Sequence, residues 1–292
     1  MKITYMSIRW QGRPSNPDIG VGNKLFYFFS AVIHRDKYNI KVVSDGKGPD
    51  KKIKKIVKLI NTDNLFYNKK EIPQNVKKTK HVEAIYDKNS NLPFYGNDIC
   101  HILCDYYHNT NTIVKNKKTV FSYINIDYYR KPALENINYI IKDKDILCCV
   151  RLGDFNGRKG NIINPDYYIN ILREISNDEN KILGKIYICV FNNTPGLTEK
   201  YLSYFEEFND KIVLIEGKDE HHDFYLPFLF KRIIMSNSTF CWWSIFLNTD
   251  ESCKVYMPDI FEKKPIGGGF CGLPVMHNTS EIRPSQPFKI IL

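Results

Sequence analysis

The chain has 292 residues, 43% of them hydrophobic and 25% charged, which is the balance of an ordinary folded globular protein. No stretch approaches the roughly 18 apolar residues that a membrane-spanning helix needs, and the N-terminal run lacks the long apolar segment of a signal peptide. We therefore expect a protein that acts in the cytoplasm. The eight cysteines, half of which lie in apolar strand-like runs, suit a reducing compartment.

The net charge of +10 is concentrated in the first part of the chain. Residues 1–80 contain 18 Lys and Arg against 6 Asp and Glu, whereas residues 81–292 contain 24 against 26. The lysines are densest in residues 51–60, K-K-I-K-K-I-V-K-L-I, where apolar residues recur at helical spacing. Such a run forms either a helix with solvated lysines or a surface that associates weakly with an anionic membrane. Nucleic-acid binding is not expected.

The first half of the chain alternates short apolar runs with two helical patterns. Strands are expected at 1–9, 39–44, 81–86 and 119–124, and helices at 22–36 and 50–61. The Pro-containing stretch from Tyr128 to Ala133 is the best linker, because a more regular series of strands follows it. We therefore expect an N-terminal domain at 1–130 and a C-terminal domain at 131–292.

The second half has a regular strand–helix rhythm. Strands are expected at 146–150, 186–191, 211–215, 232–236 and 253–257, and helices at 165–176, 198–208, 222–230 and 240–249. Pro165 and Pro195 stand where helices should start. Repeated units of this kind, with continuously apolar strands, predict an α/β fold with a parallel, doubly wound sheet.

One expected strand of this series ends in charge. Residues 145–155 read D-I-L-C-C-V-R-L-G-D-F, so that Arg151 follows the apolar run and Asp154 comes three residues later. Ligands of open α/β sheets bind outside the carboxyl ends of the strands. An arginine placed there can make a bidentate contact to a phosphate, and the carboxylate can orient it. The alternative is an Arg–Asp pair that only ties down a surface loop.

A second strand end is more informative still. Residues 232–247 read R-I-I-M-S-N-S-T-F-C-W-W-S-I-F-L, an apolar strand followed by four small polar residues and an aromatic helix. Small polar residues at this position expose backbone N–H groups at a helix N-terminus, which favours the binding of an anion. In the alternative interpretation, Ser238 or Thr239 only caps the helix and the tryptophans belong to the core.

Two groups of residues have the composition of metal ligands but not the spacing. Cys100, His101, Cys104 and His108 have no second pair of ligands to complete a structural zinc site. Asp143 and Asp145 form a D-x-D pattern, but it stands just before an apolar strand, which favours a solvated strand entry. No metal site is expected.

Three segments, in this order along the chain, resemble the signatures of one enzyme family. Residues 20–31, G-V-G-N-K-L-F-Y-F-F-S-A, are similar to the G-[LI]-G-N-Q-[LM]-F-x-Y-A opening of the α1,2-fucosyltransferases, glycosyltransferase family 11. Residues 149–154, C-V-R-L-G-D, resemble the H-x-R-R-x-D signature of the wider α1,2-, α1,6- and O-fucosyltransferase superfamily. Residues 236–247 resemble the S-N-S-[ST]-F-S-W-W-[AG]-A-x-L signature of family 11.

The resemblance implies a GT-B architecture, with two Rossmann-like domains and a cleft between them. The donor nucleotide would lie at the strand ends of the second domain, and the acceptor would approach from the first. Arg151 and Asp154 would be the catalytic residues. The donor-binding residues would be Arg151, Asn192, Asn193, Ser236, Asn237, Ser238, Thr239, Phe240 and Trp243. The residues on the acceptor side, or lining the cleft, would be Gly20, Gly22 and Asn23. Trp243 as a simple core residue is the alternative for that position.

The implied reaction is the transfer of L-fucose from GDP-β-L-fucose to a hydroxyl group of a glycan, with inversion and formation of an α1,2-linkage. The donor and the glycan acceptor would be its partners, and neither a metal nor another cofactor would be required. Arg151 and the helix N-terminus after Ser238 would neutralise the departing diphosphate.

The chain departs from the family signatures at several positions. Cys149 replaces the signature histidine, Leu152 replaces the second arginine, and Asn192-Asn193-Thr194 stands where S-D-D is common. Two alternatives therefore stay open. One is a GT-B transferase that uses another nucleotide-linked deoxysugar. The other is a protein on the same scaffold that binds nucleotides or glycans without turnover.

Overall fold

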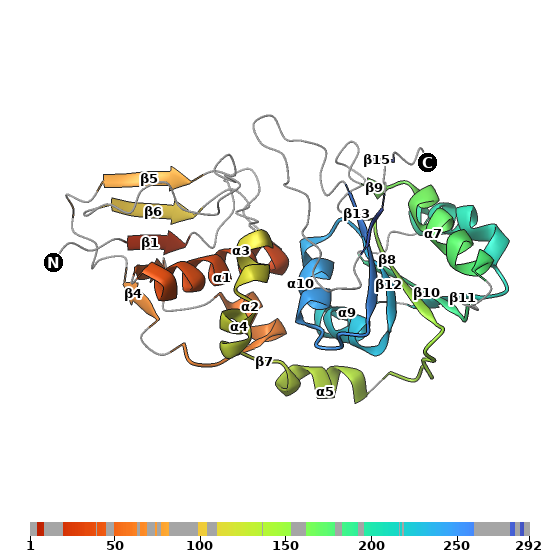
Figure 1. The fold of residues 1–292 in the computed structure, drawn as a ribbon, viewed down its shortest axis with the longest axis horizontal. Helices are drawn as coiled ribbons and strands as arrows, with labels where there is room; N and C mark the ends of the chain where they lie inside the picture. Colours follow the sequence, from red (N-terminus) through yellow and green to blue (C-terminus); the bar gives the residue numbers. More distant parts are fainter. Residues whose placement is uncertain are drawn as a thin grey trace. The chain divides into compact units, whose positions relative to one another are not determined.

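The computed structural model describes residues 5–8, 20–38, 40–44, 50–62, 65–68, 74, 77–81, 99–103, 110–135, 137–152, 162–178, 183–191, 196–215, 217, 219–259, 281–283 and 287–288. The chain divides into two compact units, and the division falls between Tyr129 and Arg130 in the middle of the sequence. Each unit contains its own parallel sheet (Figure 1).

The sheet of the first unit has five parallel strands in the order β4-β2-β1-β6-β5. These strands are β1 (Tyr5–Ile8), β2 (Lys41–Ser44), β4 (Phe66–Asn68), β5 (Lys77–His81) and β6 (Ile99–Leu103). Helix α1 (Val21–Tyr38) connects β1 to β2, and almost all of its side chains up to His34 are buried. The expected helix at 22–36 is therefore present, and it supplies a large part of the described core of this unit.

The remaining elements of this half of the chain correct two sequence-based predictions. They are α2 (Lys51–Ile56), β3 (Lys58–Leu59), α3 (Thr110–Lys115), α4 (Lys117–Ser122), β7 (Ile124–Asn125) and α5 (Asp127–Glu135), the last of which spans the division between the two units.

The helix expected at 50–61 ends at Ile56, because Val57 is extended and β3 pairs with β7 in an antiparallel ladder. The strand expected at 119–124 is mostly α4, since a short apolar run does not by itself distinguish a strand from a buried helix. The division between the units falls inside the expected linker from Tyr128 to Ala133, and the residues of this linker are helical, since they lie in α5.

The sheet of the second unit has six parallel strands in the order β11-β10-β8-β12-β13-β14. They are β8 (Ile146–Arg151), β10 (Ile186–Phe191), β11 (Ile212–Ile215), β12 (Arg232–Ile234), β13 (Lys254–Pro258) and β14 (Glu281–Arg283). A short antiparallel pair joins β9 (Ile162–Ile163) to β15 (Pro287–Phe288). The five strands that the rhythm of this half predicts are all present.

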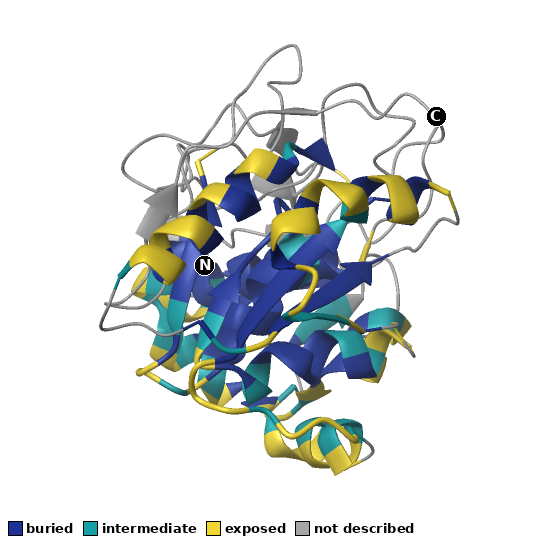
Figure 2. Cartoon of the chain, turned by 90° about the vertical axis from the view of Figure 1, so that its right-hand side faces the viewer, coloured by how far each residue is buried: buried dark blue, intermediate teal, exposed yellow. Residues whose placement is uncertain are grey.

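The helices of the second unit also follow the expected pattern. They are α7 (Pro165–Asn177), α8 (Leu197–Leu202) with the 3-10 helix η3 (Ser203–Phe208), α9 (Glu220–Tyr225) with the 3-10 helix η4 (Leu226–Leu229), and α10 (Thr239–Leu247). In Figure 1, α7 lies on one face of the sheet, and α9 and α10 lie on the other. Figure 2 shows the strands of this sheet buried between helices whose outer faces are exposed. The sheet is therefore doubly wound, as predicted.

The order of the strands locates the place where a ligand of this sheet would bind. From β8 the chain moves outward to β10 and β11, and it then returns to β12 on the other side of β8. The strand order thus reverses between β8 and β12. In open α/β sheets, ligands bind at such a reversal, outside the carboxyl ends of the strands.

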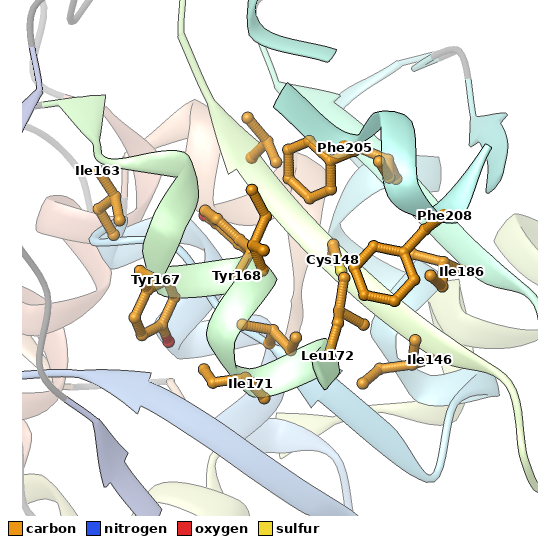
Figure 3. Close-up of a cluster of buried hydrophobic side chains, with 14 of the residues drawn as sticks. Ile146, Cys148, Ile163, Tyr167, Tyr168, Ile171, Leu172, Ile186, Phe205 and Phe208 are labelled. Carbon is orange, nitrogen blue, oxygen red and sulfur yellow. The ribbon is translucent and has the colours of Figure 1, made fainter. Parts of the chain in front are cut away.

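Buried tyrosines of α7 fix the strands on either side of this reversal (Figure 3). The hydroxyl of Tyr168 donates a hydrogen bond of 2.7 Å to the carbonyl oxygen of Cys149, near the end of β8. The hydroxyl of Tyr167 lies 3.2 Å from the carbonyl oxygen of Met235 and 3.0 Å from that of Tyr256. The tyrosine hydroxyls in this otherwise apolar core therefore satisfy the hydrogen-bonding capacity of carbonyl groups near the carboxyl ends of the strands.

Among the helices of the described residues, none combines the length and the apolar character needed to cross a bilayer.

Candidate functional site

The structure brings together the two strand ends that the sequence singles out. Arg151 is the last residue of β8, and Ser238 follows the neighbouring strand β12. The Nη1 atom of Arg151 donates a hydrogen bond of 2.7 Å to the Oγ atom of Ser238. This contact lies at the carboxyl ends of β8 and β12, where the strand order reverses. Residues 87 positions apart in the sequence thus form one polar site.

Ser238 also caps the helix that follows it. Its backbone is extended, and its hydroxyl oxygen accepts from the backbone N–H of Cys241 at 3.5 Å, while its carbonyl oxygen accepts from Trp242 at 2.8 Å. Helix α10 has nine residues and no acidic side chain in its first turn. Its N-terminus therefore carries partial positive charge directly beside a guanidinium group, an arrangement that suits an anion.

The residues of the turn differ in how far they are exposed. Ser236, Asn237 and Ser238 are buried, whereas Thr239 and Phe240 are partly exposed, as is Arg151. The hydroxyl of Ser236 is buried and has no hydrogen-bond partner among the described residues. Arg151, Thr239 and Phe240 are thus the part of the predicted donor site that reaches the surface, and the buried residues support it from below.

Trp243 is fully buried, with an exposed fraction of 0%. Its indole ring makes edge contacts with Trp242 and Phe246, and Trp242 stacks on Phe246. This burial favours the core alternative for Trp243, because large apolar side chains at helical spacing pack inward. A contact between Trp243 and the donor stays a prediction.

The ring of Phe240 packs against aromatic residues of two neighbouring elements. Its ring contacts Phe191, at the end of β10, and Phe224 of α9, with centroid distances of 5.8 and 5.2 Å. Because Phe191 is paired with Arg151 in the sheet, the Phe240 ring extends from the guanidinium group towards α9. This aromatic bridge offers an apolar surface adjacent to the anion-binding groups.

Asp223 and His222, in the first turns of α9, are residues that the sequence analysis did not select. The Nδ1 atom of His222 lies 3.2 Å from the Oδ1 atom of Asp223, and within the part of the chain that the structure describes its buried Nε2 atom has no hydrogen-bond partner. Burial raises the pKa of the Asp223 carboxyl above its ordinary value, and the hydrogen bond and charge of His222 act in the opposite direction. A His–Asp pair at the start of a helix that follows a strand was the available signal in the sequence.

Two thiols lie under the Arg151–Ser238 contact. Cys149 precedes Arg151 by two residues, Cys241 follows Ser238 by three, and a hydrogen bond between the two thiols, together with burial, raises the pKa of Cys149. Both side chains are fully buried and free of disulfides. Cys149 occupies the position of the signature histidine, so that in this chain a small buried thiol replaces an imidazole.

Gly20, Gly22 and Asn23 lie in the first unit, at the start of α1. The carbonyl oxygen of Gly20 accepts from the backbone N–H groups of Asn23 and Lys24 at 3.1 and 3.2 Å, which begins the helix. Lys24 forms an ion pair of 2.9 Å with Asp50, the residue that caps α2. Their predicted role on the acceptor side stays a prediction, as does the expected cleft.

Asp154, Asn192 and Asn193 lie outside the described residues, so that their roles also stay predictions.

The D-x-D pattern is part of the strand entry, as favoured above. Asp145 is buried, and its carboxylate accepts from the backbone N–H groups of Lys142 and Lys185, both at 2.8 Å. Asp143 forms an exposed ion pair with Lys231. Both residues precede β8, at the end of the strand opposite Arg151. Within the described ranges, no three His, Cys, Asp or Glu side chains gather closely enough to hold a metal ion.

Comparison of the whole chain with known proteins places its fold. No family model matches the chain, and no curated protein matches it. Among solved structures, it is similar to the selenomethionine form of the fucosyltransferase NodZ from Bradyrhizobium, with a TM-score of 0.50, 9% identity, and coverage of 85% of this chain and 92% of that one.

The chain is more loosely similar to POFUT1 in complex with GDP, with a TM-score of 0.42, 8% identity, and coverage of 83% of this chain and 93% of that one. It is also loosely similar to the UDP-GlcNAc 2-epimerase of Methanocaldococcus jannaschii, with a TM-score of 0.43, 14% identity, and coverage of 97% of this chain and 89% of that one. At 9% identity the likeness to NodZ is one of fold alone. The chain has a GT-B-like α/β fold, with a parallel sheet in each of its two units.

Proposed function

We propose that the protein is a glycosyltransferase that moves a deoxyhexose from a nucleoside diphosphate to a glycan hydroxyl, most specifically L-fucose from GDP-β-L-fucose. The observation that carries this proposal is the hydrogen bond between Arg151 and Ser238 at the reversal of the strand order. It joins a guanidinium group to a helix N-terminus, and both stabilise the negative charge of a diphosphate leaving group.

In this proposal each polar group of the site has its own role in binding the donor. Arg151 binds the phosphate oxygens nearest the sugar, and the first backbone N–H groups of α10 bind the remaining phosphate. Asp154 orients the site. Inversion at the anomeric carbon and formation of an α1,2-linkage are proposed from the motif resemblance. The fold, which the chain shares with NodZ, is compatible with this chemistry.

The neighbouring residues suggest where the nucleobase binds. The ring of Phe240 supplies an apolar surface and contacts Phe224. Asp223 is the residue immediately before Phe224 in the sequence. We propose that the Asp223 carboxylate accepts from the adjacent N–H groups of guanine, which form a pair of donors that uracil and adenine do not present in the same arrangement. The replacement Asp223→Asn should then weaken GDP binding more than UDP binding, as measured by calorimetry.

The experiment that tests the function is incubation of the protein with a panel of sugar nucleotides, followed by measurement of nucleoside diphosphate release. Release from GDP-fucose alone supports the proposal. Preferential release from another nucleotide-linked deoxysugar would support the first alternative, which the Asn192-Asn193 departure motivates. Binding of GDP without release from any donor, in the presence of a range of glycan acceptors, would support a binding protein without turnover.

A further inference from the structure

A strongly basic surface lies in the first unit, whereas the candidate donor site belongs to the second. Lys51, Lys54 and Lys55 lie on one side of α2, because residues three and four apart share a helix face. All three are exposed, as is Lys58 in β3, and none forms an ion pair with another described residue. These four residues are called the lysine face.

The apolar residues of the same segment do not compete for this surface. Ile53, Ile56 and Val57 are all 0% exposed and pack into the unit. The segment 51–60 therefore cannot insert its own apolar side into a membrane without unfolding locally. What it presents outward is a charged face held on a fixed backbone.

Two large side chains with apolar character are exposed beside the lysines. Tyr128 of α5 is 52% exposed, and the Nζ atom of Lys58 lies 4.9 Å from the centre of its ring. Ile60 is 36% exposed and lies on the same side of the extended chain as Lys58, since alternate residues of a strand share a face. The hydroxyl of Tyr129 donates to the carbonyl oxygen of Lys54 at 3.0 Å, which holds the start of α5 against α2.

We propose that the lysine face, together with Tyr128 and Ile60, binds the surface of a bilayer that contains anionic phospholipids. Lysines close to such a surface are attracted by its negative potential, and the attraction falls off within a Debye length. Tyrosine is favoured at the level of the headgroups, where its ring is in an apolar layer and its hydroxyl meets water. The surface thus combines the two features that reversible peripheral binding requires.

The same observations disfavour a nucleic acid as the partner. Proteins that bind single strands without sequence preference stack bases on open aromatic faces. The ring of Tyr128 already has Lys58 over it and packs edge-on against Tyr129 at 4.7 Å. Ile60 has no π-face at all. A layer of lipid headgroups needs neither stacking surface nor a continuous groove.

The test is sedimentation of the full chain with vesicles of phosphatidylcholine, alone or mixed with phosphatidylserine. We expect binding only to the mixed vesicles, and release as the salt concentration rises. The double variant K54E/K55E should lower the partition coefficient by at least about tenfold. The matched control is K142E/K144E, which changes two exposed lysines of the second unit by the same charge and should bind as the wild type does. The variant Y128A should bind less while it keeps the salt dependence.

Three outcomes would overturn the proposal. The first is wild-type binding that does not depend on phosphatidylserine, and the second is an equal loss in both double variants, which would report net charge alone. The third is a single-stranded oligonucleotide that binds the chain at salt concentrations where vesicles are released, which would assign the face to nucleic acid. Melting curves check that each variant folds, and K54Q/K55Q replaces K54E/K55E if the latter does not. Because GDP binding is measured separately, failure here leaves the proposed function untouched.

Discussion

At the scale of single residues, Arg151 is the residue whose chemistry the site depends on most. A guanidinium group presents several N–H donors in a fixed plane, so that one can hold Ser238 while others face a phosphate. Lysine offers the same charge without that geometry.

The variant Arg151→Lys should therefore lower the rate of donor turnover by orders of magnitude, because the pair of phosphate contacts is lost while the charge is kept. The melting temperature should change little, since the residue is partly exposed. Steady-state kinetics and a thermal melt measure the two effects. Turnover at the wild-type rate would remove Arg151 from the mechanism.

Asp223 should make the free energy of unfolding depend on pH in a predictable direction. Burial raises its pKa above the ordinary value of 3.8, so that the carboxyl is harder to ionise in the folded protein than in the unfolded chain. Its contribution to the free energy of unfolding is thus fully present below the unfolded pKa and is lost as the pH rises through the folded-state pKa.

We therefore expect the wild type to lose stability relative to Asp223→Asn as the pH rises from the ordinary pKa of an aspartic acid through the raised folded-state pKa. Denaturant unfolding of both proteins across this range measures the difference. A difference that is constant with pH, or that grows in favour of the wild type, would show that the carboxyl is not destabilised by burial.

A third residue-scale prediction concerns the entry to β8. A Cβ atom added to Gly184 would lie 2.4 Å from the Oδ1 atom of Asp145 and 2.8 Å from the carbonyl group of Lys144. The variant Gly184→Ala should destabilise the protein by about 1–3 kcal/mol, the usual result of overpacking. The control Gly20→Ala meets nothing within 4 Å and should cost much less.

At the scale of elements, the sequence predicts the second unit far better than the first. Strands such as 186–191 are wholly buried and bounded by turn residues in the sequence, so that their length and composition suffice to predict them as strands. The register that brings Arg151 to Ser238 cannot be read from local patterns, because it depends on which strands become neighbours. In the first unit, Val57 leaves the helix because Lys58 and Leu59 find partners in β7, a pairing that residues 51–60 do not reveal.

Helix α7 supports the site through the hydroxyl groups of its tyrosines. The variant Tyr168→Phe keeps the packing of the ring but removes the bond to the Cys149 carbonyl oxygen, at a cost of about 1–3 kcal/mol in the free energy of unfolding. Tyr139→Phe, at an exposed ring, serves as the control. Equal stability of the two variants in urea would mean that the bond to Cys149 does not hold the end of β8.

At the scale of the whole molecule, the GT-B-like fold and the motif resemblance point in the same direction. The sequence motifs select Arg151 and residues 236–240, and the strand order then shows that these segments adjoin at the reversal between β8 and β12. The burial of Ser236 to Ser238 and of Trp243 was not predictable in detail, since it depends on how α10 packs against the sheet. The central claim is that a nucleoside diphosphate binds at this junction.

Hydrogen–deuterium exchange of the full chain, with and without saturating GDP, tests that claim most directly. Bound phosphate should slow exchange of the backbone amides of the first residues of α10, Thr239 and Phe240, because these N–H groups become its donors. Peptides from residues 51–60 should exchange as before, since they belong to the first unit and hold none of the proposed phosphate donors. Protection confined to the peptides around Arg151 and α10 is the predicted result. Saturable GDP binding with unchanged exchange at the start of α10, or no binding at millimolar GDP, would contradict the account.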